Sequence, residues 1–122
     1  MDNVLISLKL PFPITVNHFY NRRGHYTFIS EKGLAFNKKV LDIVDNLDPE
    51  FIIDSPIAME IYVVEPDKRR RDLDNLTKSC LDSLVKARLI SDDHIIHDLR
   101  IYKTGEVVKG AGYVVVTIKK II

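Results

Sequence analysis

Three consecutive arginines stand directly before a pair of carboxylates near the middle of the chain. The carboxylates are Asp72 and Asp74, and the same polar segment continues to Lys78. Arginine binds phosphate oxygens through a planar pair of donors, whereas two neighbouring carboxylates repel each other and favour a bound cation. This combination indicates a site that brings a metal ion to a phosphodiester. The arginines are Arg69, Arg70 and Arg71.

A second acidic pair, Asp92 and Asp93, follows the helix that we expect to begin at Asp72 or Asp74. Residues two apart do not face each other within a helix. An N-cap residue is not helical, however, so these two carboxylates can converge at the helix start. Mg²⁺ is a hard cation that proteins hold through one or two carboxylates, with waters left for substrate phosphates. We therefore expect Mg²⁺ here, with Asp92 or Asp93 completing the site.

Lys78 follows Asp74 by one helical turn and lies on the same face. A lysine there could steady a carboxylate, contact a phosphate, or stabilise negative charge in a transition state. Ordinary roles explain the same residues. Aspartates at a helix start are common caps and dipole partners, and Asp74 with Lys78 is a typical helix ion pair. The arginines suit a solvated loop, and Asp92–Asp93 suits a turn, so the spacing alone leaves both interpretations open.

The composition is that of one ordinary globular domain, which we expect to span residues 1–122. Lys and Arg number 18 and Asp and Glu number 17, so the net charge is +1 and only local clusters can attract nucleic acid. The single cysteine, Cys80, cannot form an intramolecular disulfide and fits a reducing compartment. No apolar run resembles a signal peptide or a membrane span. We expect a cytoplasmic protein without a membrane partner.

Alternating apolar and polar residues predict strands, whereas apolar residues three to four apart predict helices. Ser30 is a good N-cap for a helix that reaches about residue 47, and the second helix should run to about Arg88. The apolar run 114–116 favours a central strand. We predict an α/β domain with two helices packed on a mixed β-sheet. Strands are expected at 4–10, 26–29, 57–63, 95–103 and 113–120, turns at 104–106 and 109–112, and an irregular polar segment at 14–25.

The block from Asp67 to Lys78, followed by Leu84-Val-Lys-Ala87 and Asp92-Asp93, resembles the RusA family of Holliday-junction resolvases (crossover junction endodeoxyribonucleases). The resemblance extends over nearly the whole chain and implies a RusA-like fold. The block from 67 to 93 is its most specific part. Further matches near the N-terminus are Leu10, Pro11, Phe12, Pro13, Asn17, Tyr20, Ser30 and Gly33.

The resemblance implies a homodimeric, Mg²⁺-dependent endonuclease, of a kind often encoded by prophages, that acts in DNA recombination and repair. Such enzymes bind four-way DNA junctions and nick two opposed strands symmetrically. The matching positions for the catalytic, metal-binding carboxylates are Asp72, Asp74 and Asp93, and Lys78 matches the essential lysine. The DNA-binding residues that we expect are Arg69, Arg70, Arg71, Asn17 and Lys78.

Two departures from the family pattern stand out. Arg88 occupies a position where relatives often have glycine, the residue best suited to end a helix in the left-handed conformation. The segment 14–17 also differs, which bears on DNA contacts more than on chemistry. Two alternatives remain. A catalytically silent junction-binding protein is disfavoured because all three carboxylates and the lysine are present, whereas a Mg²⁺-dependent nuclease for forks or flaps stays open.

Overall fold

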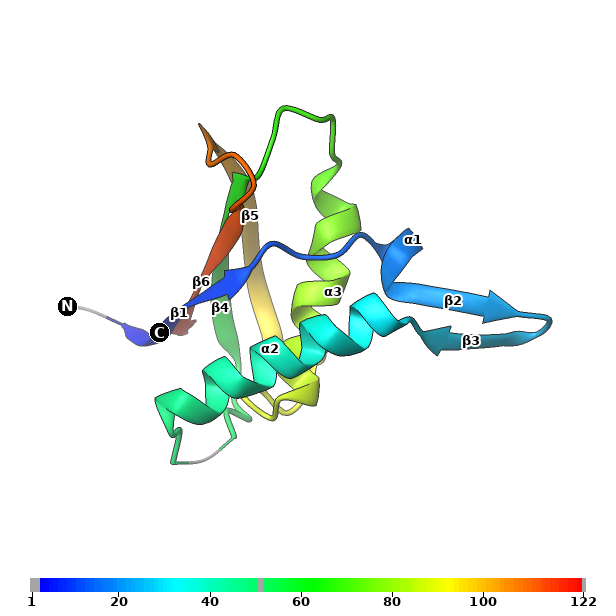
Figure 1. The fold of residues 1–122 in the computed structure, drawn as a ribbon. Coiled ribbons are helices and arrows are strands. Elements are labelled where there is room, and N and C mark those ends of the chain that lie inside the picture. The colour runs from blue at the N-terminus through cyan, green and yellow to red at the C-terminus, as the bar shows by residue number, and fades with distance from the viewer. Residues whose placement is uncertain (1–2, 51, 122) are drawn as a thin grey trace.

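A computed structural model describes residues 3–50 and 52–121. It contains a four-stranded mixed sheet, two longer helices packed together, and a two-stranded hairpin that projects away from the rest of the fold (Figure 1). In chain order the elements are β1 (Val4–Pro11), α1 (Val16–Phe19), β2 (Tyr20–Arg23), β3 (Tyr26–Ile29), α2 (Glu31–Leu47), β4 (Ile57–Glu65), α3 (Leu73–Lys86), a 3₁₀ turn η1 (Asp93–Ile95), β5 (Ile96–Val107) and β6 (Tyr113–Lys120). The predicted α/β class is confirmed.

The sheet has the strand order β1-β6-β4-β5. β4 runs parallel to β5, whereas β6 pairs antiparallel with both β1 and β4. The central position predicted for the strand containing the run 114–116 is therefore confirmed. β5 forms one edge of the sheet and pairs with β4 alone, so most of its side chains are exposed.

Strict alternation along β4 and β6 explains why the helices cover a single face of the sheet. Every second residue of β4 from Ile57 to Val63 is fully buried, and so are Val114, Val116 and Ile118 of β6. The intervening side chains lie on the opposite, open face, where Glu60 accepts a 2.9 Å hydrogen bond from Lys119. Successive strand residues point to opposite faces. The helices α2 and α3 therefore complete one core on the apolar face.

The start of α2 depends on a glycine that allows two segments to approach closely. The N-cap Ser30 accepts a 3.0 Å hydrogen bond from the backbone N–H of Gly33, as the sequence predicts. A Cβ on Gly33 would lie 2.7 Å from the carbonyl oxygen of Phe19, closer than real contacts allow. The absence of a side chain at Gly33 thus allows the start of α2 to pack closely against α1.

The end of α3 is a Schellman motif in which Arg88 takes the position usually given to glycine. Arg88 has a φ of 65°. Its N–H donates to the carbonyl of Val85 at 3.0 Å, and the N–H of Leu89 donates to the carbonyl of Leu84 at 3.1 Å, which are the two bonds of that motif. Leu84 and Leu89 are both buried, so the motif also contributes to the core. The helix end expected near Arg88 is confirmed.

The segment 14–25, predicted to be irregular, forms the short helix α1 and the strand β2. β2 pairs with β3 from Tyr20 opposite Ile29 to Arg23 opposite Tyr26, with Gly24 at a φ of 61° in the turn. A glycine of positive φ at the first position of a two-residue turn suits a type II′ hairpin. The sequence of β2 has no apolar alternation, so it gives no local signal for a strand. Backbone pairing with β3 forms this strand.

The predicted turn at 104–106 is also wrong, since β5 continues to Val107. Gly105 has a φ of 85°, and the pairing of β5 with β4 shifts register between Val63 and Glu65. An irregularity of this kind lets a strand bend without ending. Within the described residues, no helix combines the length and the apolar character that a membrane span requires.

Candidate metal and phosphate site

The start of α3 presents two exposed carboxylates. Asp72 is the N-cap residue, with φ −93° and ψ 134°, and its side chain makes no capping hydrogen bond. Asp74 lies in the first helical turn. The ordinary interpretation of Asp72 as a side-chain cap is therefore wrong. Its exposed carboxylate is therefore available to bind another group.

A cavity of about 630 Å³ collects several of the predicted residues between α3, η1 and β5. Asp74 and Lys78 reach it from α3, and Asp93 reaches it from η1. Its other walls are mainly apolar, which lowers the local polarity around the charged groups. The residues lining it are Leu73, Asp74, Thr77, Lys78, Leu81, Asp82, Asp93, Leu99 and Ile101.

Asp72 is not among the residues that line this cavity. It lines a smaller depression of about 250 Å³ together with Thr15, Arg70, Arg71 and Asn75. The described residues contain no group of three His, Cys, Asp or Glu side chains arranged to hold one ion. Two carboxylates with oxygen ligands still fit Mg²⁺, which commonly retains several waters. Asp74 and Asp93 line one cavity and have suitable oxygen ligands, and metal binding by Asp72, Asp74 and Asp93 stays a prediction.

Asp92 and Asp93 differ in what their side chains already bind. Asp92 caps η1 by accepting a 2.8 Å hydrogen bond from the N–H of Asp93, and it lies 3.0 Å from Nδ1 of His94. The hydrogen bond from His94, followed by that backbone bond, holds the pKa of Asp92 below its usual value. Asp93 faces the cavity shared with Asp74 instead. This difference supports the choice of Asp93, which the resemblance implies.

Lys78 pairs with Asp82 and not with Asp74. Its Nζ lies 3.4 Å from Oδ2 of Asp82, one helical turn further along α3. Asp82 also accepts a short hydrogen bond from the hydroxyl of Tyr20. Burial, followed by the bond to Asp82, raises the pKa of Tyr20 to about 12. The sequence singles out Tyr20 only through the resemblance to the family, with no role in the site, and does not single out Asp82. The spacing of Lys78 and Asp82 could have indicated one of them, but Tyr20 is 62 positions from Asp82.

The three arginines have different environments. Arg71 is largely buried, with its guanidinium 2.9 Å from Asp67 and 3.3 Å from Glu65, and it lies 5.1 Å from the ring centre of Phe12. Hydrogen bonds to these carboxylates, that to Asp67 first, raise the pKa of Arg71. It therefore fixes the loop between β4 and α3. Arg69 and Arg70 are exposed, and Arg69 lies 3.6 Å from Asp67 in an exposed ion pair, so both remain accessible to a ligand.

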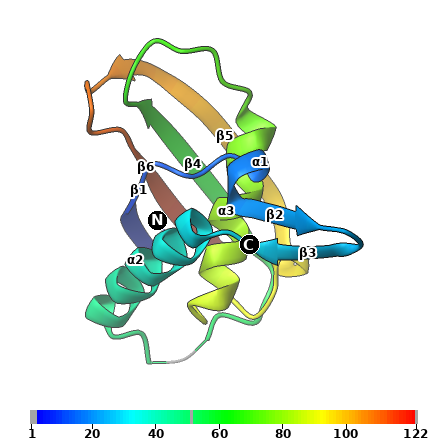
Figure 2. The same ribbon diagram turned by 45° about the vertical axis from the view of Figure 1, so that its right-hand side comes forward.

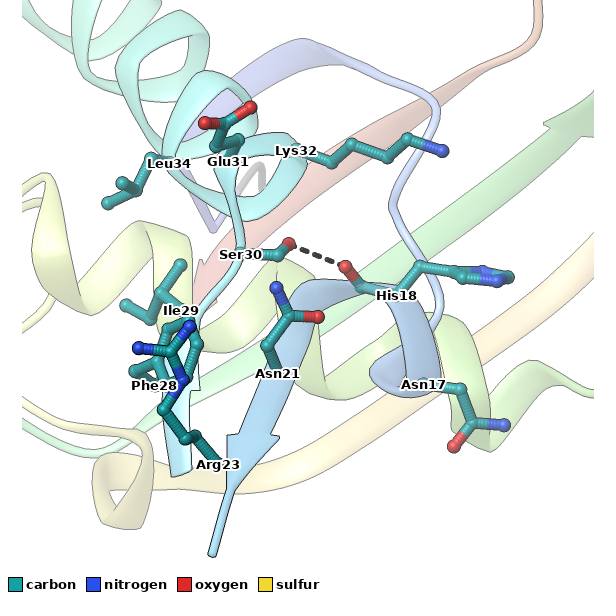
Figure 3. A pocket seen from close by; sticks show the side chains of 10 residues that line it. All are labelled: Asn17, His18, Asn21, Arg23, Phe28, Ile29, Ser30, Glu31, Lys32 and Leu34. Atoms are coloured by element: carbon teal, nitrogen blue, oxygen red, sulfur yellow. Dashed lines mark hydrogen bonds between the residues drawn. The ribbon is translucent and has the colours of Figure 1, made fainter. Parts of the chain in front are cut away.

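Asn17 is exposed on α1 and lines a second cavity, of about 560 Å³, between the hairpin and the start of α2. Figure 3 shows this cavity, with the hydroxyl of Ser30 donating to the carbonyl of His18 at 2.5 Å. Arg23 and Lys32 supply positive charge around it, and Glu31 supplies negative charge. This cavity is distinct from the one that Asp74 and Asp93 line, so the DNA contact expected of Asn17 stays a prediction.

Comparison with known proteins identifies the family of this chain. A model of the family described as Endodeoxyribonuclease RusA matches residues 11–119. Crossover junction endodeoxyribonuclease rusA of Enterobacteria phage HK97 is 37% identical over 94 residues, covering 77% of this chain and 78% of the relative. The proteins named Crossover junction endodeoxyribonuclease RusA from Shigella sonnei and Escherichia coli are 37% and 36% identical over 97 residues, covering 80% of this chain and 81% of each relative.

The α/β fold, the cavity of carboxylates and lysine, and the match across nearly the whole chain define a domain of the endodeoxyribonuclease class. The chain belongs to the RusA family. The resemblance expected from the block 67–93 is therefore confirmed. That block lies inside the matched range and carries most of the residues that line the larger cavity and the depression beside Asp72.

Proposed function

We propose that this chain is a Mg²⁺-dependent endonuclease that binds four-way (Holliday) DNA junctions as a homodimer and resolves them by symmetric paired nicks. The observation that carries the proposal is the cavity in which Asp74, Asp93 and Lys78 meet, in a chain of the RusA family. Its relatives are named as crossover junction endodeoxyribonucleases. We place its action in the cytoplasm, in recombination or repair.

In this proposal, Asp74 and Asp93 bind the metal ion, and Asp72 joins them once DNA is bound at the helix start. The bound ion supplies activation of a water molecule and neutralisation of the scissile phosphate. Lys78 places a positive charge where the transition state gains negative charge.

DNA binding depends on the exposed cations around this cavity. Arg69 and Arg70 lie on the loop that leads into α3 and can bind backbone phosphates. Asn17 lies beside the second cavity, where it can contact a neighbouring part of the DNA backbone. A two-fold dimer would present two equal sites, as a substrate with near two-fold symmetry requires.

The direct test is a nicking assay on a four-way junction, a fork, a flap and a linear duplex, each with Mg²⁺ or with a chelator. We expect Mg²⁺-dependent nicks in opposed strands of the four-way junction and little cleavage of the duplex. Preferential cutting of forks or flaps would contradict the choice of substrate. Junction binding without any Mg²⁺-dependent cleavage would favour the catalytically silent alternative.

A further inference from the structure

Lys78 lies on α3 between two carboxylates, each one helical turn away. Asp74 precedes it by four residues and Asp82 follows it by four. An acidic residue on the N-terminal side of a lysine forms the better ion pair at this spacing. In an isolated helix, Lys78 would therefore form its ion pair preferentially with Asp74. Lys78 pairs with Asp82 instead, and the described part of the chain contains no ion pair of Asp74.

Tyr20 supplies the physical reason for this choice. Its hydroxyl donates a hydrogen bond to Oδ2 of Asp82, the same oxygen that faces Lys78. Nζ of Lys78 also lies 5.9 Å from the centre of the Tyr20 ring, within reach of a cation–π attraction. Asp82 and Tyr20 together therefore bind Lys78 more strongly than an isolated helix carboxylate does.

The position of Tyr20 is itself fixed by packing. Its ring meets the ring of Phe19 edge-on, with centroids 4.8 Å apart, and Phe19 is fully buried. Tyr20 is the first residue of β2, directly after α1, and α1 lies against α3 in both ribbon views (Figure 1 and Figure 2). A residue from a distant part of the chain thus anchors Asp82 at the side of α3.

Asp82 cannot share a metal ion with Asp74. Eight residues of α-helix separate them, a rise of about 12 Å. Oxygen ligands of one Mg²⁺ ion lie about 2 Å from the metal. Asp82 lines the same cavity as Asp74 and Lys78. Asp82 therefore acts in this cavity through its ion pair with Lys78.

We propose that Tyr20 and Asp82 are positioning residues that hold Lys78 away from Asp74, which leaves Asp74 free to bind the metal ion. This inference rests on the proposed function, in which Asp74 is a metal ligand and Lys78 stabilises the transition state. Without Asp82, Lys78 turns towards Asp74 and forms the locally favoured ion pair. That pair opposes metal binding and removes the lysine from its working position.

The decisive experiment measures Mn²⁺ binding to the full chain without DNA, by the loss of the free-ion paramagnetic resonance signal. Mn²⁺ is a hard divalent ion that suits carboxylate ligands. Asp82→Asn should weaken Mn²⁺ binding by about twofold, the size of one helix ion pair. In a Lys78→Ala background, Asp82→Asn should change nothing. Asp42→Asn is the matched control, because Asp42 pairs with Lys38 on α2 at the same spacing and the same 3.4 Å distance.

Three results would overturn the inference. Equal weakening by Asp82→Asn with and without Lys78 would show that Asp82 attracts the ion by its own charge. Unchanged Mn²⁺ affinity in the single Asp82→Asn variant would show that Lys78 does not turn to Asp74. A wild-type protein that binds no Mn²⁺ would overturn both this inference and the proposed function. Mn²⁺ binding with the expected coupling, but no nicking of any junction, would overturn the proposed function alone.

A second variant tests the inference independently of Asp82→Asn, in case that variant does not fold. Tyr20→Phe removes only the hydroxyl and retains the ring that packs on Phe19. We expect single-turnover cleavage of the junction to slow by about tenfold, since small displacements of a catalytic group have large effects on rate. Junction affinity should stay at the wild-type level, which separates the positioning of Lys78 from DNA binding. An unchanged cleavage rate would contradict the role of Tyr20.

Discussion

The carboxylates around the start of α3 are the residues on which the proposed chemistry depends most directly. Asp72→Asn, Asp74→Asn and Asp93→Asn should each abolish Mg²⁺-dependent junction cleavage while junction binding persists, because an amide retains the shape and loses the charge that holds the ion. Gel-shift binding and single-turnover cleavage on the same preparations measure both properties. Asp92→Asn is the matched control and should cleave nearly normally, since Asp92 is occupied by Asp93 and His94. An active Asp93→Asn variant would exclude Asp93 from the metal-binding carboxylates.

Arg88 is a single residue whose left-handed backbone conformation has a cost in stability. A non-glycine residue with positive φ is strained by about 1 kcal/mol or more. Arg88→Gly should therefore raise the free energy of unfolding by about 0.5–1 kcal/mol, after allowance for the greater freedom of glycine in the unfolded chain. Urea denaturation measures this change. Arg88→Ala removes the side chain but retains the Cβ, and an equal gain in that variant would contradict the explanation.

Tyr20 predicts a dependence of stability on alkaline pH. Its pKa is about 12 in the folded protein, above the ordinary value of 10.0. The folded state therefore retains the phenol proton more tightly than the unfolded state does, and its contribution to stability is complete below pH 10 and is lost as the pH rises towards 12. Denaturation of wild type and Tyr20→Phe at several pH values should show a steeper loss in the wild type over that interval. Parallel curves would contradict the raised pKa of Tyr20, of which burial is the first cause and the hydrogen bond to Asp82 the second.

At the scale of the elements, the loop between β4 and α3 combines a fixed part with an exposed part. Arg71 is held by Asp67 and Glu65, and Nζ of Lys103 donates to its carbonyl at 2.6 Å. Arg69 and Arg70 project from the loop that these contacts organise. The contacts of Arg71 thus fix the loop, and Arg69 and Arg70 lie exposed on it before the start of α3. Its own contact with DNA stays a prediction.

The loop arginines should account for part of the salt dependence of junction binding. Each phosphate contact adds about 0.9 to the slope of log affinity against log salt. Replacing both Arg69 and Arg70 by alanine should therefore lower the slope by about two, as measured by fluorescence anisotropy at several salt concentrations. Lys38→Ala with Lys39→Ala, on α2 at the opposite side of the molecule from this loop, is the control (Figure 1). An unchanged slope in the arginine variant would return the loop to its interpretation as a solvated charge cluster.

At the scale of the whole molecule, two equal sites require two copies of the chain. β5 is an edge strand with exposed apolar side chains, among them Leu99, Tyr102 and Val107. We expect light scattering at micromolar concentration to give twice the mass of the 14.0 kDa chain. The dimer should persist in Asp74→Asn, because that change lies in the proposed metal site. A monomer under these conditions would contradict symmetric paired nicking, since one chain offers one such site.

The sequence by itself determined the main elements and the position of the acidic and basic residues along them. Alternation predicts β4 and β6 correctly, and Ser30 predicts the start of α2, because these signals depend on neighbours a few residues apart. The same local order places Asp72 and Asp74 at a helix start. It also identifies the family through the block 67–93.

Only the tertiary structure decided which charged groups meet. Lys78 has two carboxylates at equal spacing, and the choice of Asp82 depends on Tyr20, which the fold brings from β2 to the side of α3. Arg71 reads as an exposed cation in the sequence, yet packing against Phe12 buries it. The strand β2 has no periodic signal and forms only by pairing with β3. Contacts between residues far apart in the chain decide these features, because burial and low polarity change the strength of an ion pair or hydrogen bond.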